Sequence, residues 1–102
     1  MKIFLSHPMK GKSQEVIIAE REEAMPLIKA LVGTDDFEVI DSVITEQVPA
    51  GTTWEAVWYM GKGLELMSKA DKIVFMPGWE TAGVCNVENM VASVYGIPTL
   101  IL

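Results

Sequence analysis

Short β-favouring apolar runs alternate with segments of helical periodicity along the chain, and this alternation limits the possible folds more than any other feature. The apolar runs lie at residues 2–6, 37–40, 72–76 and 97–102. Between them, apolar residues recur at three- to four-residue spacing over residues 13–32, over residues 52–69 and between Gly78 and Gly96. Helical spacing predicts helices, and short apolar runs bounded by Gly or Pro predict strands. The predicted order of elements is βαβαβαβ.

This order predicts an α/β fold of the three-layer, doubly wound type, like flavodoxin-like and Rossmann-like folds. Strands joined through helices run parallel, the crossovers are right-handed, and helices cover both faces of the sheet. We expect a four-stranded parallel sheet with strand order 2-1-3-4. A chain of 102 residues is long enough for one hydrophobic core and too short for two, so a single domain over residues 1–102 is expected.

Each predicted helix carries an apolar stripe that should face the sheet. The stripes are Ile17, Ala24, Ile28 and Leu31 in the first helix, Val57, Met60, Leu64 and Met67 in the second, and Val84, Val87, Val91 and Val94 in the third. Residues 20–23 are charged and belong to the wet side of the first helix, which Pro26 should kink. Residues 52–55, Thr-Thr-Trp-Glu, have the form of a capping box. Gly33 and Gly96 are expected to end the first and third helices.

The charge balance argues against a protein that binds nucleic acid polymers. The formal net charge is −6 at pH 7, and Arg21 is the only arginine. Affinity for a phosphate backbone rests largely on Lys and Arg, and the basic residues here form no patch. No apolar run approaches the roughly 20 residues that span a bilayer. We therefore expect a small-molecule partner and no membrane role.

Cysteine content and the large apolar residues bear on location and assembly. The single cysteine, Cys85, cannot form an internal disulfide, and no charged-then-apolar leader precedes the first strand. Both observations favour a cytoplasmic protein. A small domain leaves much apolar surface uncovered, so the seven Met and three Trp residues predict a homo-oligomer, either a dimer or a tetramer.

The predicted topology also locates the functional loops. In doubly wound sheets, ligands bind beyond the carboxyl ends of the strands, where the direction of winding reverses. The loops at that edge are residues 7–12, 41–51 and 77–83. We expect them to form a cleft that accepts a nucleotide-sized ligand.

Residues 6–13, Ser-His-Pro-Met-Lys-Gly-Lys-Ser, match the phosphate-binding loop GxxxxGK[ST] except at the first glycine. That glycine permits the tight wrap of such a loop, and Pro8 removes an amide that would point at phosphate. No acidic residue ends the third strand to hold magnesium, so we do not expect a nucleoside triphosphatase. Two interpretations remain for Lys12 and Ser13 at the start of the first helix. They either form an anion-binding site or belong to an ordinary loop and helix cap.

Glu88 is the best candidate for a reactive side chain because it lies about one turn into the third helix, near the predicted cleft. A carboxylate near a helix N-terminus is favoured in its ionised form, which suits a nucleophile. The alternative is a solvated Glu that interacts only with the helix dipole. Cys85 shares a helix face with Glu88. It is either a thiol of lowered pKa or a small apolar filler.

Two interpretations are possible for the role of His7, and two for the role of three aromatic residues. His7 is either a proton shuttle or ligand contact, or a loop residue without a chemical role. A single histidine has no partner set for a metal site, and we expect neither a metal nor another cofactor. Trp54, Trp58 and Tyr59 either stack on a base or pack at a subunit interface.

Three segments of the chain resemble one known family. They are Leu-Ser-His-Pro-Met-Lys-Gly at residues 5–11, the pattern PGW-x-x-x-G-x-C-x-x-E at residues 77–88, and Gly-Ile-Pro at residues 96–98. Together with Tyr59-Met60 ahead of Ala70-Asp71, and Ala92, they are similar to the small DUF4406 proteins of phages and bacteria. That family is identified as part of the nucleoside 2-deoxyribosyltransferase-like superfamily. His7 stands where glycine is usual.

The resemblance implies an N-glycosidic enzyme that acts on a nucleoside or nucleotide, of the deoxyribosyltransferase or deoxynucleoside 5′-phosphate N-hydrolase type. By position, Glu88 resembles the glutamate that attacks the anomeric carbon of the sugar, as in retaining glycosidases. The further residues that the resemblance places around the substrate are Ser6, His7, Met9, Gly11, Trp79, Gly83 and Cys85.

Two positions depart from the superfamily pattern. Gly63 occupies the place of an aspartate that supports the leaving base, and Ala82 replaces an aspartate six residues before the nucleophile. Glu80, Asp41 and Glu46 are the carboxylates that could substitute. A nucleotide-binding sensor or sequestering protein that has lost turnover is therefore the main rival reading, and a purely structural oligomer is the third.

Overall fold

The computed structural model describes residues 1–102 and confirms the predicted alternation of strands and helices. Its elements are β1 (Lys2–Ser6), α1 (Gln14–Val32), β2 (Glu38–Val39), α2 (Glu55–Met67), β3 (Lys72–Phe75), the 3-10 helix η1 (Trp79–Thr81), α3 (Gly83–Tyr95) and β4 (Thr99–Ile101). β1 has the bounds of its apolar run, whereas β2, β3 and β4 are shorter than the runs that predicted them. The short helix η1 was not anticipated, since three residues are too few to show a period.

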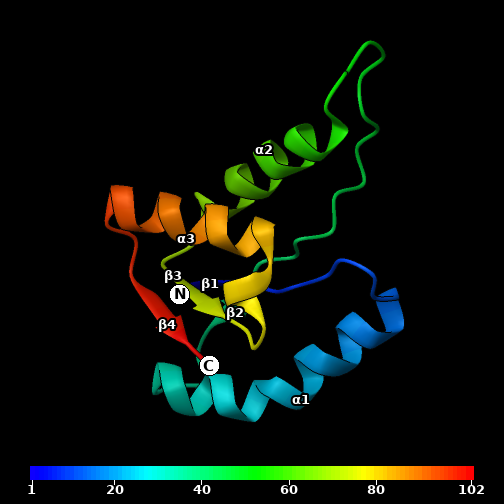
Figure 1. Ribbon diagram of the computed structural model, residues 1–102. Helices are drawn as coiled ribbons and strands as arrows, with labels where there is room; N and C mark the ends of the chain where they lie inside the picture. Colours follow the sequence, from blue (N-terminus) through cyan, green and yellow to red (C-terminus); the bar gives the residue numbers. More distant parts are fainter.

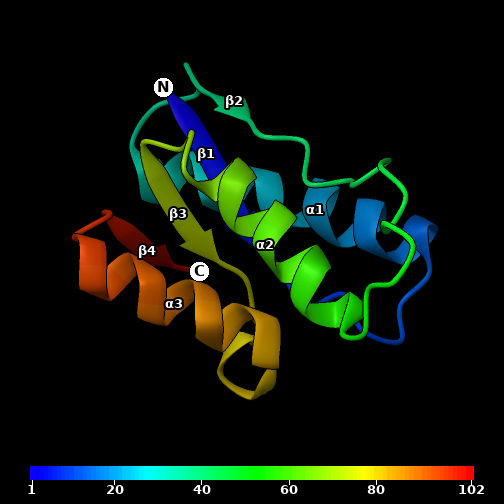
Figure 2. The same ribbon diagram turned by 90° about the horizontal axis from the view of Figure 1, so that it is seen from above.

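The four strands form one parallel sheet in the order β2-β1-β3-β4, as predicted. β1 and β3 are the central strands, with Ile3 opposite Lys72 and Ser6 opposite Phe75. Helix α1 covers one face of the sheet, while α2 and α3 cover the other, giving three layers (Figure 1). Figure 2 shows α2 and α3 lying side by side over the strands.

Alternation along β1 divides the core into two clusters. Ile3 and Leu5 pack with Ala24 and Ile28 of α1. Phe4 faces the other way and packs with residues of α2, β3 and α3. Because successive side chains of a strand point to opposite faces, the next two residues, Ser6 and His7, are also directed to opposite sides of the sheet.

Helix ends follow the glycine signals. Gly33 closes α1 with φ 86° and Gly96 closes α3 with φ 70°, a left-handed conformation that costs glycine little. Helix α1 continues through Pro26 without a break. No helix reaches the combination of length and hydropathy that a membrane span requires.

Three predictions about the helices are wrong. The stripes of α1 and α2 face the core only in part, because Leu31 and Val57 are exposed. The capping box at residues 52–55 does not form: α2 starts after Trp54 without a side-chain cap, and Thr52 instead donates to the carbonyl of Pro49. The valine stripe of α3 does not face the core either, because Val84, Val87 and Val94 are exposed. The face of α3 that meets the sheet carries Cys85, Glu88 and Ala92.

Candidate functional site

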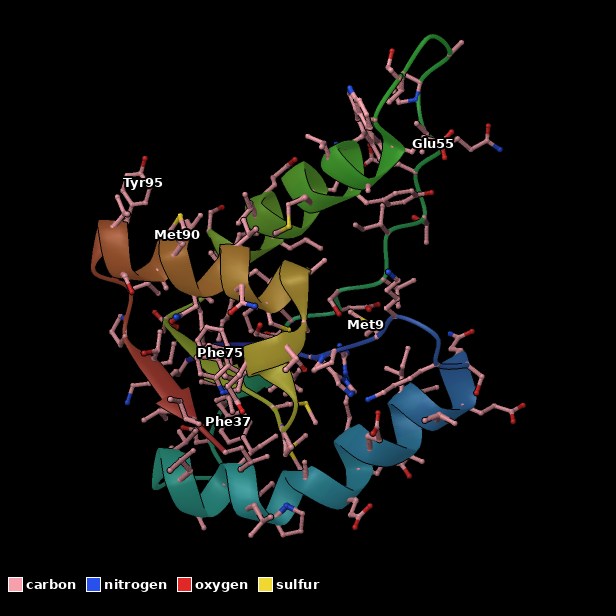
Figure 3. The ribbon with its side chains drawn as sticks, viewed as in Figure 1. Met9, Phe37, Glu55, Phe75, Met90 and Tyr95 are labelled. Atoms are coloured by element: carbon pink, nitrogen blue, oxygen red, sulfur yellow. The ribbon has the colours of Figure 1, made fainter.

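A cleft of about 640 Å³ opens at the carboxyl ends of the two central strands, where the topology predicts a ligand site. Its walls come from the loop after β1, the loop after β3 and the first turn of α3, together with one residue of α2. The lining residues are His7, Pro8, Met9, Lys10, Ala56, Gly78, Thr81, Ala82, Gly83, Val84 and Cys85. The loop after β2, which we also expected there, does not contribute to the walls. Met9 marks the β1 side of the cleft in Figure 3.

Ser6 and Glu88 form a buried polar pair next to this cleft. The Ser6 hydroxyl donates to Oε1 of Glu88 at 2.7 Å, and Glu88 is only 4% exposed. The pair forms because Ser6 is the last residue of β1 and points toward the layer that contains α3. Cys85, one helical turn before Glu88, lines the cleft, whereas Ser6 and Glu88 themselves do not.

Burial changes the ionisation of Glu88 in the direction opposite to our expectation. Loss of solvent raises its pKa from 4.5 to about 7, and the hydrogen bond from Ser6 offsets only part of that effect. The helix dipole was expected to favour the ionised form, but Glu88 lies in the second turn of α3, beyond the free amides. At neutral pH the side chain is therefore divided between its protonated and ionised forms.

The second oxygen of Glu88 faces α2 at a glycine. Oε2 makes no hydrogen bond within the protein, and a Cβ atom built on Gly63 would lie 3.9 Å from it. Gly63 is the position at which the resemblance described above implies an aspartate. Two of the three substitutes that we considered are occupied in other ways: Glu46 pairs with Lys62 at 2.9 Å, and Asp41 accepts the amide of Val43. The third, Glu80 in η1, is exposed and does not line the cleft.

The first turn of α3 presents unpaired backbone amides at the cleft. Ala82 provides no side-chain cap, and Asn86 is the first residue of the helix whose amide finds a backbone acceptor. The amides of Gly83, Val84 and Cys85 precede it and all three residues line the cleft. Such amides favour negatively charged groups.

Of the other predicted site residues, Gly83, Cys85, Met9 and His7 line the cleft, and four do not. Lys12 pairs with Glu20, and Ser13 caps α1 by accepting the amide of Val16. Gly11 forms a turn with φ 78°. Trp79 packs against Phe75 in the core, and its Nε1 is fully buried without a hydrogen-bond partner.

Sequence reasoning missed several residues of this region. Pro8, Lys10 and Gly78 belong to motifs described above, and Thr81 lies in a loop that topology indicated, but none of the four was predicted to be a site residue. Ala56 has no signal, because its place in the wall depends on how α2 packs. Burial raises the pKa of the Cys85 thiol, which favours the interpretation of Cys85 as an apolar filler.

No group of three or more His, Cys, Asp or Glu side chains lies close enough to hold a metal ion. The model of a family described as a domain of unknown function, DUF4406, matches residues 1–101. Comparisons with curated proteins and with solved structures gave no match.

Proposed function

The chain belongs to the DUF4406 family, and we propose that its cleft binds a deoxynucleoside or its 5′-phosphate and that Glu88 cleaves the N-glycosidic bond. The observation that carries this proposal is the Ser6–Glu88 pair beside the cleft. One carboxylate oxygen is held by the Ser6 hydroxyl, and the other is unbonded. A buried carboxylate with one unbonded oxygen is suited to nucleophilic attack. The proposal includes membership of the nucleoside 2-deoxyribosyltransferase-like superfamily.

In the proposed reaction, Oε2 of ionised Glu88 forms a bond to the anomeric carbon while the bond from that carbon to the base nitrogen breaks. The electron pair of that bond leaves with the base, which takes a proton. Water, or a second base in a transferase, then attacks the same carbon and frees the carboxylate. Because only ionised Glu88 can attack, the rate should rise with pH through about 7.

The cleft walls support binding of an anionic or polar sugar end near α3. The free amides of Gly83, Val84 and Cys85 and the ammonium group of Lys10 are the groups there that favour negative charge. A 5′-phosphate at this edge would interact with them, and this is a reason to test nucleotides beside nucleosides.

A second candidate function is binding of the same ligands without turnover. Gly63 favours it, because no acidic side chain stands opposite Glu88 to protonate the leaving base. Ala82 at the start of α3 likewise offers no carboxylate to the cleft. A sensor or sequestering protein would retain the cleft and need no proton donor.

The experiment is incubation of the purified protein with a panel of deoxynucleosides and their 5′-phosphates, with chromatography for free base and melting curves on the same samples. We expect base release that is lost in Glu88→Gln, whose side chain still accepts from Ser6. Release at the same rate in Glu88→Gln would refute the role of Glu88. Ligand-dependent stabilisation without base release would favour the binding protein. If neither stabilisation nor base release is observed, both functions are rejected.

We further propose that two copies of the chain associate through the outer face of α3. Its exposed residues Val84, Val87 and Val94, with the half-buried Val91, follow the 3-4-3 spacing at which two helices pack. Met90 and Tyr95 also point away from the sheet (Figure 3). The only charged residue of α3 is Glu88, which points inward, so this face adds no repulsion between two chains of net charge −6.

Sedimentation velocity tests the assembly. The wild type should sediment as a dimer or tetramer, and Val87→Asp should shift it to the monomer. Lys29→Asp on the opposite layer is the control and should leave the assembly intact. A monomeric wild type at micromolar concentration would reject this interface.

A further inference from the structure

A partly exposed hydrogen-bond network surrounds the buried side chain of His7 on the α1 side of the sheet, opposite Glu88. The His7 side chain is 2% exposed, and its Nε2 lies 3.0 Å from Oε1 of Glu20. On the other side of the ring, the Nε–H group of Arg21 donates to Nδ1 at 3.1 Å. Both ring nitrogens thus have a partner on α1.

These two contacts determine the tautomer of His7. Arginine has only donors, so Nδ1 must accept and cannot carry a proton. A carboxylate only accepts, so Nε2 must carry the proton that it donates to Glu20. The geometry therefore requires a neutral imidazole protonated at Nε2. A second proton, on Nδ1, would meet the N–H group of Arg21 and break that bond.

The network links His7 to α1 and to two loops at the carboxyl edge of the sheet. A terminal nitrogen of Arg21 donates to Ser42, in the loop after β2, at 2.8 Å. Lys12 donates to both carboxylate oxygens of Glu20, at 2.9 and 3.1 Å, and thereby fixes the end of the loop after β1. The charged and polar groups that surround the ring thus come from α1 and from two loops.

Pro8, the residue after His7, contacts the third loop. A Cβ atom on Gly78 would lie 3.6 Å from Cγ of Pro8, and Gly78 has φ 89°. His7 is joined to the loop after β2 through Arg21, and its neighbour packs on the loop after β3. Both His7 and Gly78 line the cleft.

We propose that His7 is a positioning residue: as a neutral imidazole protonated at Nε2, it holds the loop after β1 between α1 and the two neighbouring loops and so sets the wall of the cleft. Protonation of Nδ1 releases Arg21 and loosens that wall. This role replaces proton transfer or direct substrate binding by His7, and it does not depend on which function the cleft performs.

The charges around the ring favour the neutral form. Burial is the largest effect and lowers the pKa of His7, and the positive charges of Arg21 and Lys12 lower it further. Glu20 acts in the opposite direction through its hydrogen bond and its charge. Glu23 on α1 lines a small pocket together with His7 and Glu20, and Asp41 acts on Arg21. The wall should therefore be ordered at neutral pH and loosen only under acidic conditions.

The test is nitrogen NMR of the protein with ¹⁵N-labelled histidine, since His7 is the only histidine of the chain. At pH 7 we expect a pyrrole-type Nε2 and a pyridine-type Nδ1, and a titration midpoint below 6.5. Arg21→Met should raise the midpoint because it removes a positive charge and frees Nδ1, whereas Glu20→Gln should lower it. A proton on Nδ1 at pH 7, or a midpoint above 6.5, would overturn the proposal.

Loosening of the wall is followed through the backbone amides of Met9 and Gly78. In the Glu88→Gln background, which removes the other group that titrates near neutrality, both amide signals should shift with the midpoint of His7. His7→Gln, which retains a donor toward Glu20, should keep the neutral-pH amide positions better than His7→Leu. Amide signals that ignore the titration of His7 would show that the ring does not control the loop. Ser42→Ala releases the far end of Arg21 without removing charge, and it replaces Arg21→Met if that variant fails to fold. It should raise the exchange rate of the Lys12 amide, which donates to the carbonyl of Met9 at 3.1 Å.

Discussion

Replacing Glu88 by glutamine should stabilise the protein, and increasingly so as the pH rises. Folding raises the pKa of Glu88 from 4.5 to about 7, so the folded state binds more protons than the unfolded state between these values. The free energy of unfolding of the wild type therefore contains a term that is fully present below pH 4.5 and is lost as the pH rises through 7. Glutamine has no such term, yet it still accepts from Ser6.

The size of the effect follows from the shift. The rise of the Glu88 pKa from 4.5 to about 7 corresponds to about 3 kcal/mol, because each pKa unit is worth about 1.4 kcal/mol. The stability advantage of Glu88→Gln over the wild type should grow by that amount between pH 4.5 and pH 9. It should do so without a change in the denaturant dependence, because the surface exposed on unfolding is the same.

Urea unfolding at pH 5, 6, 7, 8 and 9 measures this difference. Other groups titrate equally in both proteins, so their contributions cancel. Glu22→Gln removes an exposed carboxylate of α1 and should run parallel to the wild type. A constant difference between Glu88→Gln and the wild type, or one that shrinks with rising pH, would refute the reasoning that burial controls Glu88.

Further predictions concern single positions. Gly63→Asp places a second carboxylate opposite Oε2 of Glu88 and should raise the pKa of Glu88 further, by on the order of one unit or more. In the same urea series, the free energy of unfolding should then continue to fall at higher pH than in the wild type. An unchanged pH dependence of unfolding would show that the two positions do not face each other. Gly78→Ala should lower the free energy of unfolding by about 1–2 kcal/mol, because a φ of 89° disfavours a side chain. Gly61→Ala, at an uncrowded position of α2, should raise it by up to about 1 kcal/mol. Equal effects of the two substitutions in thermal denaturation would contradict this prediction. Cys85, fully buried with a raised pKa, should react with a thiol reagent only as fast as the protein opens, and rapid labelling of the native protein would show otherwise.

The sequence is sufficient for the topology because the signals that determine it are local. Apolar runs mark the strands, and Gly33 and Gly96 end their helices with positive φ. Parallel order then follows from the connections. The location of the cleft follows in turn, since it depends only on where the strand direction and the crossovers place the loops.

Packing is the part that periodicity does not determine. Helix α3 has two faces with helical spacing, one of valines and one with Cys85, Glu88 and Ala92, and the second one meets the sheet. The valine face has the pattern of a core stripe because it carries no charge, whereas the face that meets the sheet contains Glu88. The pKa of Glu88 was misjudged for the same reason, since burial outweighs proximity to a helix start.

The His7 network was also beyond the reach of local signals. Glu20 and Arg21 belong to a charged run that reads as a solvated helix face. They contact His7 only because α1 extends along the exit of β1, and that placement depends on tertiary structure. The sequence shows that Glu20 and Arg21 are neighbours. It does not show that the ring of His7 lies between them.

The most direct test of the central claim is peptide mass spectrometry of the protein quenched in acid during incubation with a deoxynucleoside or its 5′-phosphate. The proposed reaction predicts free base in solution and a deoxyribosyl adduct, with or without its phosphate, on the peptide that contains Glu88 and on no other. Base release that continues in Glu88→Gln without an adduct at residue 88 would contradict the assignment of Glu88 as the nucleophile.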